Sequence, residues 1–287
     1  MQEIAPGIYV ESNYPPYNLG LITTEDGPIV VDIPPRPSHA WAWRHQVEEI
    51  AGSPRYAVIT DGSPERQIAA ALWNVPIIAA AETLRTITAY DERGWRDRLH
   101  AFVALYPTEA EVMAKVKPHR PTIAFDEQFM LYSTPSLYFE TVHGAALGSL
   151  WLTIPERNLL FAGDTVVVNE PPPLAHTSDS KAWLNTLTVL SHRATVRQIV
   201  PGRGPALILR QRIEPQREFL RVMRRTARTL AHRGQDGLRI TQSAEDLGQV
   251  FFNALGQKAV RSIRSGLERL IEEILAVQVP PSDEETA

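Results

Sequence analysis

The sequence predicts an α+β protein in which two β-sheets pack against each other and helices cover the outside. Strand-like segments come in two blocks, the first within residues 7–79 and the second within residues 122–200, and each block is accompanied by helical segments. Such a pattern is typical of layered proteins with one core between the sheets. Beyond the second block the chain is helical. We therefore expect a core domain over residues 1–210 and a helical extension over residues 211–279.

The first block begins with strands and then alternates helix with strand. Glu25-Asp26-Gly27 is a turn signal between two short apolar runs and predicts a hairpin. Residues 81–106 carry apolar side chains at helical spacing, and Gly94 is expected to bend or divide this helix. We expect strands at residues 7–10, 19–22, 28–32, 56–60 and 75–79, and helices at residues 38–50, 64–73 and 81–106.

The second block contains short strands, one helix and a last strand. Asp179 directly precedes a helical pattern and suits the N-cap position. We expect strands at residues 122–125, 128–132, 137–142, 149–154, 159–162 and 198–200, and a helix at residues 179–190.

The remaining chain predicts helices from residue 212 to about residue 234, at 243–255 and at 260–277. Residues 210–233 include eight arginines, which is more typical of a solvated helix face than of a nucleic-acid contact in a chain of net charge -4. Residues 280–287 are acidic and polar and predict a disordered tail. The C-terminal helices are expected either to cover the sandwich or to form the contact of a homodimer, since symmetric dimers are the commonest oligomers.

Composition excludes several classes of protein. The chain has 287 residues and no cysteine, so disulfides, thiolate zinc sites and a cysteine nucleophile are impossible. No basic, apolar leader opens the sequence, and no segment approaches the ~20 apolar residues that a membrane helix needs. We therefore expect a soluble cytoplasmic protein without a membrane partner.

Five segments, in order, resemble the metallo-β-lactamase superfamily. They are Val30-Val31-Asp32, Ile59-Thr60, Ala145-Ala146-Leu147-Gly148-Ser149, Leu159-Leu160-Phe161-Ala162-Gly163-Asp164 and Ile199-Val200-Pro201-Gly202-Arg203-Gly204. The resemblance covers roughly residues 3–205. It implies a four-layer αββα sandwich with a site at one edge between the sheets, and the helical segments that follow it form the expected C-terminal helical extension.

The resemblance also implies positions for two metal ions, which lower the pKa of a bridging water and polarise the substrate. Carried over residue by residue, the seven ligand positions fall on Asp61, Ser63, Glu65, Arg66, Ala145, Asp164 and Arg203. Serine is a poor ligand and alanine is none. A guanidinium group stays cationic and has no lone pair to donate. We therefore expect that the dizinc site is lost and that no cofactor is bound.

Without metal, three carboxylates at this site would repel one another. We expect Arg66 and Arg203 to replace the missing cations and to form ion pairs with Asp61, Glu65 and Asp164. Three other interpretations of single residues are weaker. His143 suits a strand-end histidine better than a displaced ligand. Ser63 lacks the Gly-x-Ser-x-Gly elbow of a serine nucleophile, and the turn around Arg203 suits an inherited loop better than a phosphate cradle.

These residues predict a catalytically degenerate member of the fold, a pseudoenzyme that binds a small anionic molecule or serves as a scaffold. The alternative is a hydrolase of an ester, thioester or phosphodiester. It would hold one divalent metal ion through Asp61, Glu65, His143 and Asp164. The two arginines count against it, because they place positive charge where the cation would lie.

Overall fold

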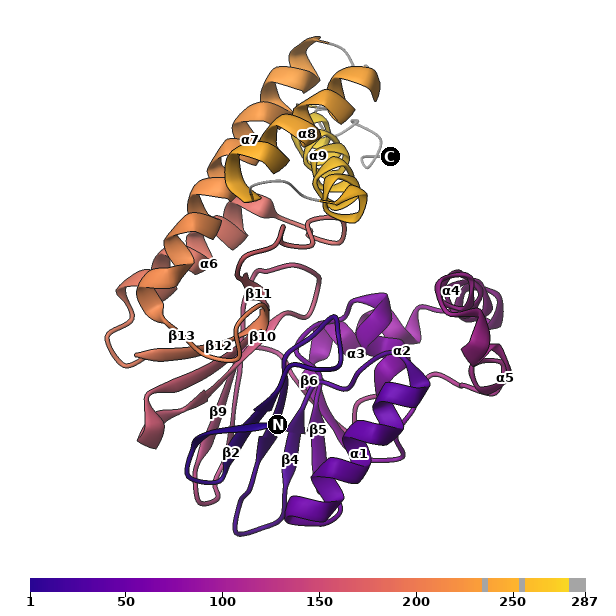
Figure 1. Ribbon diagram of the computed structural model, residues 1–287, viewed down its shortest axis with the longest axis vertical. Helices are drawn as coiled ribbons and strands as arrows, with labels where there is room; N and C mark the ends of the chain where they lie inside the picture. Colours follow the sequence, from indigo (N-terminus) through magenta and orange to yellow (C-terminus); the bar gives the residue numbers. More distant parts are fainter. Residues whose placement is uncertain (234–236, 253–255, 279–287) are drawn as a thin grey trace, which may run out of the picture.

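The computed structural model describes residues 1–233, 237–252 and 256–278. Two β-sheets pack face to face and helices lie on both outer faces (Figure 1), which confirms the predicted α+β sandwich. The tail predicted to be disordered, residues 280–287, lies outside the described residues. No helix in the described ranges is long and apolar enough to cross a membrane.

The first sheet has seven strands in the order of the sequence, β1 to β7. Its first four strands pair antiparallel and the remaining neighbours pair parallel. The carboxyl ends of β4 and β5 therefore meet at one edge of the sheet. The strands are β1 Gln2–Ala5, β2 Ile8–Glu11, β3 Leu19–Ile22, β4 Ile29–Val31, β5 Tyr56–Val58, β6 Ile77–Ala80 and β7 Ile123–Phe125.

The second sheet has six strands in the order β13-β12-β11-β10-β9-β8. Its neighbours are antiparallel except for β11 and β12, which run parallel. The carboxyl-terminal halves of these two strands carry residues of the site described below. The strands are β8 Gln128–Leu131, β9 Leu137–Thr141, β10 Leu150–Ile154, β11 Leu159–Val167, β12 Gln198–Arg203 and β13 Ile208–Leu209.

The helices divide between the two outer faces. Those of the first part are α1 Pro37–Ala51, α2 Pro64–Ala70, α3 Ala81–Thr88, α4 Glu92–Leu105 and α5 Ala110–Met113. The helix α6 Ser180–His192 and the C-terminal helices pack on the second sheet, where they share one apolar cluster with it. The C-terminal helices are α7 Glu214–Arg233, α8 Gly237–Phe252 and α9 Gln257–Gln278.

Side chains alternate between the two faces of the strands, as the period of two along a strand requires. In β3, Leu19 and Leu21 point to the helices, whereas Ile22 points between the sheets. In β11, Leu160 points to the outer cluster and Phe161 points inward. The central strands of both sheets are therefore buried on two faces, with one apolar layer between the sheets and further apolar clusters beneath the outer helices.

Several predicted boundaries need correction. The predicted helix over residues 81–106 is two helices, but the break falls at Tyr90-Asp91 and Gly94 lies inside α4. The Asp91 carboxylate accepts a hydrogen bond from the Gly94 backbone N–H and caps α4, and a cap of this kind begins a new helix. The edge strands β1 and β13 were not predicted, and α8 begins six residues before the predicted start at residue 243.

Gly20 controls how closely the two sheets approach. A Cβ atom on Gly20 would lie 2.5 Å from Cε1 of Phe161, which belongs to the opposite sheet, and 3.0 Å from Cβ of Val31. We expect Gly20→Ala to destabilise the protein by about 1–3 kcal/mol through overpacking. Urea unfolding measures this difference. A Cβ on Gly237 meets no atom within 4 Å, so Gly237→Ala serves as the control. Equal stability of the two variants would contradict this account of the sheet interface.

Candidate functional site

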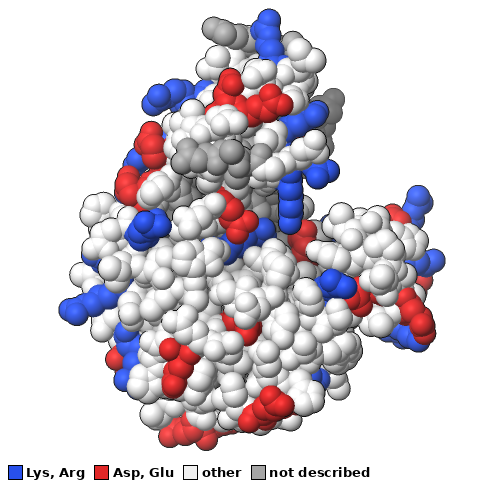
Figure 2. Space-filling view, in the orientation of Figure 1, with Lys and Arg blue, Asp and Glu red and all other residues white. Residues whose placement is uncertain are grey.

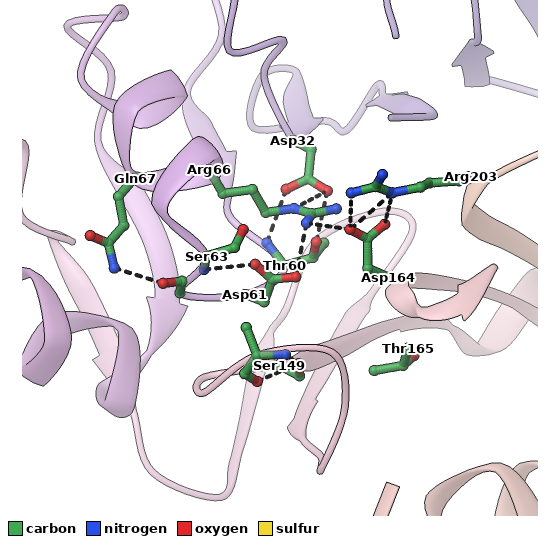
Figure 3. A network of polar contacts seen from close by, with 12 residues as sticks. Asp32, Thr60, Asp61, Ser63, Arg66, Gln67, Ser149, Asp164, Thr165 and Arg203 are labelled. Carbon is green, nitrogen blue, oxygen red and sulfur yellow. Dashed lines mark hydrogen bonds and ion pairs between the residues drawn. The ribbon is translucent and has the colours of Figure 1, made fainter. Parts of the chain in front are cut away.

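Arg66 is fully buried at one edge of the sandwich, where the two sheets meet. Pro64 occupies the first turn of α2 and Arg66 follows it, so its side chain reaches from the helix into the space between the strand ends. Its Nη1 atom donates to Asp61 Oδ2 at 2.8 Å and to Asp164 Oδ2 at 3.0 Å. Figure 3 shows the guanidinium group between carboxylates that come from both sheets.

A third carboxylate, Asp32, follows β4 and faces the same guanidinium group. Its Oδ2 atom lies 3.0 Å from Nε of Arg66, an ion pair whose angle does not satisfy a hydrogen bond. Asp32 has a φ angle of 58°, in the left-handed region. Its carboxylate accepts hydrogen bonds from the backbone N–H and the hydroxyl group of Thr60, at 3.0 and 2.7 Å. These bonds hold Asp32 in place whether or not Arg66 moves.

Arg203 reaches Asp164 from the other side. Its Nη2 atom donates to Asp164 Oδ2 at 2.9 Å, and its Nε atom lies 3.2 Å from both carboxylate oxygens. The neighbouring Gly202 permits this approach, because a Cβ there would lie 2.4 Å from Asp164 Oδ1. Asp164 thus bridges two guanidinium groups in a geometry of charge-assisted hydrogen bonds.

Tyr17 covers both guanidinium groups with its ring. The ring centre lies 3.9 Å from Cζ of Arg66 and 5.3 Å from Cζ of Arg203, within cation–π range. The adjacent Asn18 fixes this loop to the end of β12, since its backbone N–H and its side-chain amide donate to Gly202 and Pro201. Nη2 of Arg66 has no hydrogen-bond partner within the described ranges, so stacking on Tyr17 is part of its environment.

The charges at this site shift one another's ionisation. Burial alone would raise the pKa of Asp164, but the guanidinium groups of Arg203 and Arg66 outweigh burial and hold this pKa well below its usual value. Burial alone would lower the pKa of Arg66. The carboxylates of Asp164, Asp32 and Asp61 outweigh this effect and raise the pKa well above its ordinary value. Burial raises the pKa of Asp32, and Arg66 offsets this only in part. Arg66 and Asp164 therefore stay ionised at neutral pH.

The other predicted positions lie around this cluster without joining it. Ser63 is buried, its backbone N–H donates to Asp61, and its hydroxyl oxygen has no partner among the described residues. Glu65 is half-buried, faces a cavity, and forms no ion pair in the described part of the chain. Ala145 is buried at the wall of the same cavity. His143 is exposed and lines a different cavity, so it does not join the acidic residues.

Arg66 and Arg203 therefore form the expected ion pairs with Asp164, but the prediction is wrong for one of the other carboxylates. We expected Glu65 to take part, whereas the structure places Asp32 there. Glu65 lies in the first turn of α2, one residue before the side chain that points inward. Asp32 could have been found, because a carboxylate directly after an apolar strand is a signal in itself. Tyr17 gives no comparable signal in the sequence.

The residues present do not fit a pair of metal ions. A guanidinium nitrogen lies within 3.0 Å of the carboxylates of both Asp61 and Asp164, and it cannot donate a lone pair to a metal ion. Within the described ranges no three His, Asp or Glu side chains gather in an arrangement that could hold a metal ion. The arrangement can instead neutralise carboxylates and present part of Arg203 to the cavity, where its side chain is 20% exposed.

No family model and no curated protein matches the sequence. Solved structures do match. A metallo-β-lactamase family protein from Thermus thermophilus is 17% identical with a TM-score of 0.65, and the match covers 96% of this chain and 95% of that one. A metallo-β-lactamase from Pontibacter korlensis is 13% identical with a TM-score of 0.58, and the match covers 77% of this chain and 97% of that one.

A double mutant of the sec-alkyl sulfatase PisA1 is 12% identical with a TM-score of 0.65. That match covers 99% of this chain but 50% of the sulfatase, so this chain spans half of its length. Together these similarities show that the protein has the metallo-β-lactamase fold, as the sequence motifs predicted. At these identities they show the fold alone.

Removing the Asp164 carboxylate tests the buried ion pairs. We expect Asp164→Asn to lower the free energy of unfolding by about 3–5 kcal/mol at pH 7, because two guanidinium groups lose their shared partner. The folded-state pKa of Asp164 is depressed, so its stabilisation is present above the unfolded value of about 3.9 and is lost as pH falls below it. The difference between wild type and variant should therefore shrink in acid.

Urea unfolding between pH 7 and pH 3 measures this difference. The exposed pair of Arg85 and Asp126 provides a control. Asp126→Asn should change stability by about 1 kcal/mol or less at every pH. A loss for Asp164→Asn that stayed constant down to pH 3 would show that its charge does not stabilise the fold.

Proposed function

We propose that this protein is a member of the metallo-β-lactamase fold that binds a small anion and has no dizinc hydrolase activity. The observation that carries the proposal is the position of Arg66, with Nη1 within 3.0 Å of both Asp61 and Asp164. In a hydrolase of this fold a metal ion would activate water and polarise the substrate. A guanidinium group can neutralise the carboxylates but can do neither of these.

Anion binding is favoured by the residues that face the cavity beside this cluster. The cavity has a volume of about 450 Å³, within the range of small-molecule sites. Arg203, Lys258 and Arg261 line it, and its two most buried carboxylates, Asp61 and Asp164, already have guanidinium partners. Lys258 and Arg261 belong to none of the ion pairs of the described residues, so they are available to a small anion, whereas Glu65 on the same wall repels one.

Metal content tests the first half of the proposal. Tag-free protein grown with zinc, manganese and iron should contain close to no metal by elemental mass spectrometry, because Arg66 excludes the ions by charge and by volume. A stoichiometry near one that disappeared in Asp164→Asn would contradict the proposal. It would favour a hydrolase with a rebuilt mononuclear site.

Thermal unfolding in the presence of simple anions tests the second half. Acetate, phosphate and sulfate are suitable probes, with chloride at equal ionic strength as the reference. A ligand that binds only the folded protein, at ten times its Kd, stabilises by about 1.4 kcal/mol, so at least one probe should raise Tm. Lys258→Gln should reduce the rise, whereas Lys181→Gln, which changes an exposed lysine on α6 away from this cavity, should not. No rise with any anion would leave a scaffolding role as the better interpretation.

A further inference from the structure

The cavity beside Arg203 is one half of a longer groove. A second cavity of about 550 Å³ lies next to it. Both are lined by Leu105, Arg203 and Lys258, so they meet along these side chains. Figure 2 shows the corresponding hollow between the C-terminal helices and the projection formed by α4 and α5, with basic and acidic side chains on its walls.

The two halves differ in the elements and the charged groups that line them. The half beside Asp164, here called the polar half, is lined by the carboxylates of Asp61, Glu65 and Asp164, and α9 contributes Lys258, Arg261, Ser262 and Ser265. The other half, here called the apolar half, lies between the loop after β2 and helices α2 and α4. Its apolar lining includes Pro15, Pro16, Ile68, Phe102 and Leu105. Of the further cations that line it, Arg36 is paired with Glu109 and Arg98 lies over the ring of Tyr90.

The polar half contains donors that lack partners. Lys258 and Arg261 are exposed and belong to none of the ion pairs of the described residues, although the charge of Lys258 acts on the carboxylate of Glu170 and offsets part of the rise that burial causes in its pKa. Most other arginines of the C-terminal helices are paired, as with Arg221 and Glu218. The Ser63 hydroxyl is buried, 8% exposed as a residue, and its oxygen has no hydrogen-bond partner within the described ranges. Such groups are stabilised by a ligand that carries acceptor oxygens.

Glu65 determines where an anionic group can lie. Its carboxylate faces both halves of the groove and has no cationic partner among the described residues, so it repels an anion from the junction. Lys258 and Arg261 lie on α9, on the opposite side of the polar half. The anion is therefore drawn toward α9.

The apolar half exposes apolar surface to water, which is energetically unfavourable. Leu105 is 73% exposed although it ends an amphipathic helix, and it lies near the buried Phe102 in the same helix. A large exposed leucine at the junction of two cavities is favourably covered by an apolar ligand, since burying such surface is the main source of binding energy in small-molecule pockets. The two halves together favour a molecule with one charged end and one apolar end.

We propose that the groove binds an amphipathic carboxylate, with its carboxylate at Lys258 and Arg261 of α9 and its apolar body against Leu105 and Phe102. This inference rests on the proposed anion-binding function and names the chemical class of the ligand. It also gives the C-terminal helices a part in binding, because α9 supplies the cations that meet the head group.

Calorimetric titration of the full chain with octanoate tests this arrangement. Acetate carries the same head without a chain, and 1-octanol carries the same chain without a charge. We expect octanoate to bind at least about tenfold more tightly than either. Lys258→Gln with Arg261→Gln should weaken octanoate binding by about tenfold or more, and Leu105→Ser should also weaken it. All three positions are exposed, so the fold should tolerate the changes.

Matched controls are Lys181→Gln for the charges and Leu209→Ala, a leucine 59% exposed on β13, for the apolar contact. Both should bind octanoate like the wild type. If acetate binds as tightly as octanoate and Leu105→Ser has no effect, the amphipathic inference is wrong while anion binding stands. If octanol equals octanoate, the head-group assignment fails. If neither acetate nor octanoate binds, the inference fails, and the proposed function fails with it only if phosphate and sulfate also leave Tm unchanged.

Discussion

The buried guanidinium group of Arg66 is the interaction on which this edge of the sandwich depends. Asp32 and Asp61 follow strands of the first sheet, whereas Asp164 belongs to the second, so a single cation links the two sheets. Without it three buried carboxylates would face one another, and desolvation would force protons onto them. Arg203 and the ring of Tyr17 complete the enclosure. The site is thus an ion-pair network that holds the sheets together as well as a wall of the cavity.

Much of the fold could be predicted, because its causes are local. Apolar runs of strand length, turn residues such as Gly27 and the Asp179 cap determine short stretches of chain, and Asp179 does cap α6. The errors occur where tertiary contacts decide. The strands β1 and β13 lie at sheet edges. The side chains of β1 are exposed or half-buried and β13 has two residues, so neither contains an apolar run that predicts a strand. Gly94 was expected to break a helix, yet the Asp91 cap three residues earlier sets the boundary.

The site was predictable only where the family motif carried the information. Asp61, Arg66, Asp164 and Arg203 follow from the motif positions, and the chemistry of guanidinium groups indicates that they pair with acids. The choice of Asp32 over Glu65 depends on which way a side chain points from the first turn of α2. The contribution of α9 depends on residues that are nearly two hundred positions apart in the sequence but line the same cavity, such as Ser63 and Arg261. No local pattern in the sequence contains that relation.

The ring of Tyr17 over Arg66 helps to determine whether the cation at this site can leave it. A metal ion in such a place is an exchangeable component, drawn from the surroundings and open to loss or replacement by a competing ion. Arg66 is joined to the backbone of α2, is fully enclosed, and is covered by an aromatic ring, so it cannot be exchanged or removed by a chelator. The positive charge that Arg66 places at this site is therefore encoded in the gene and independent of the metal supply of the cell.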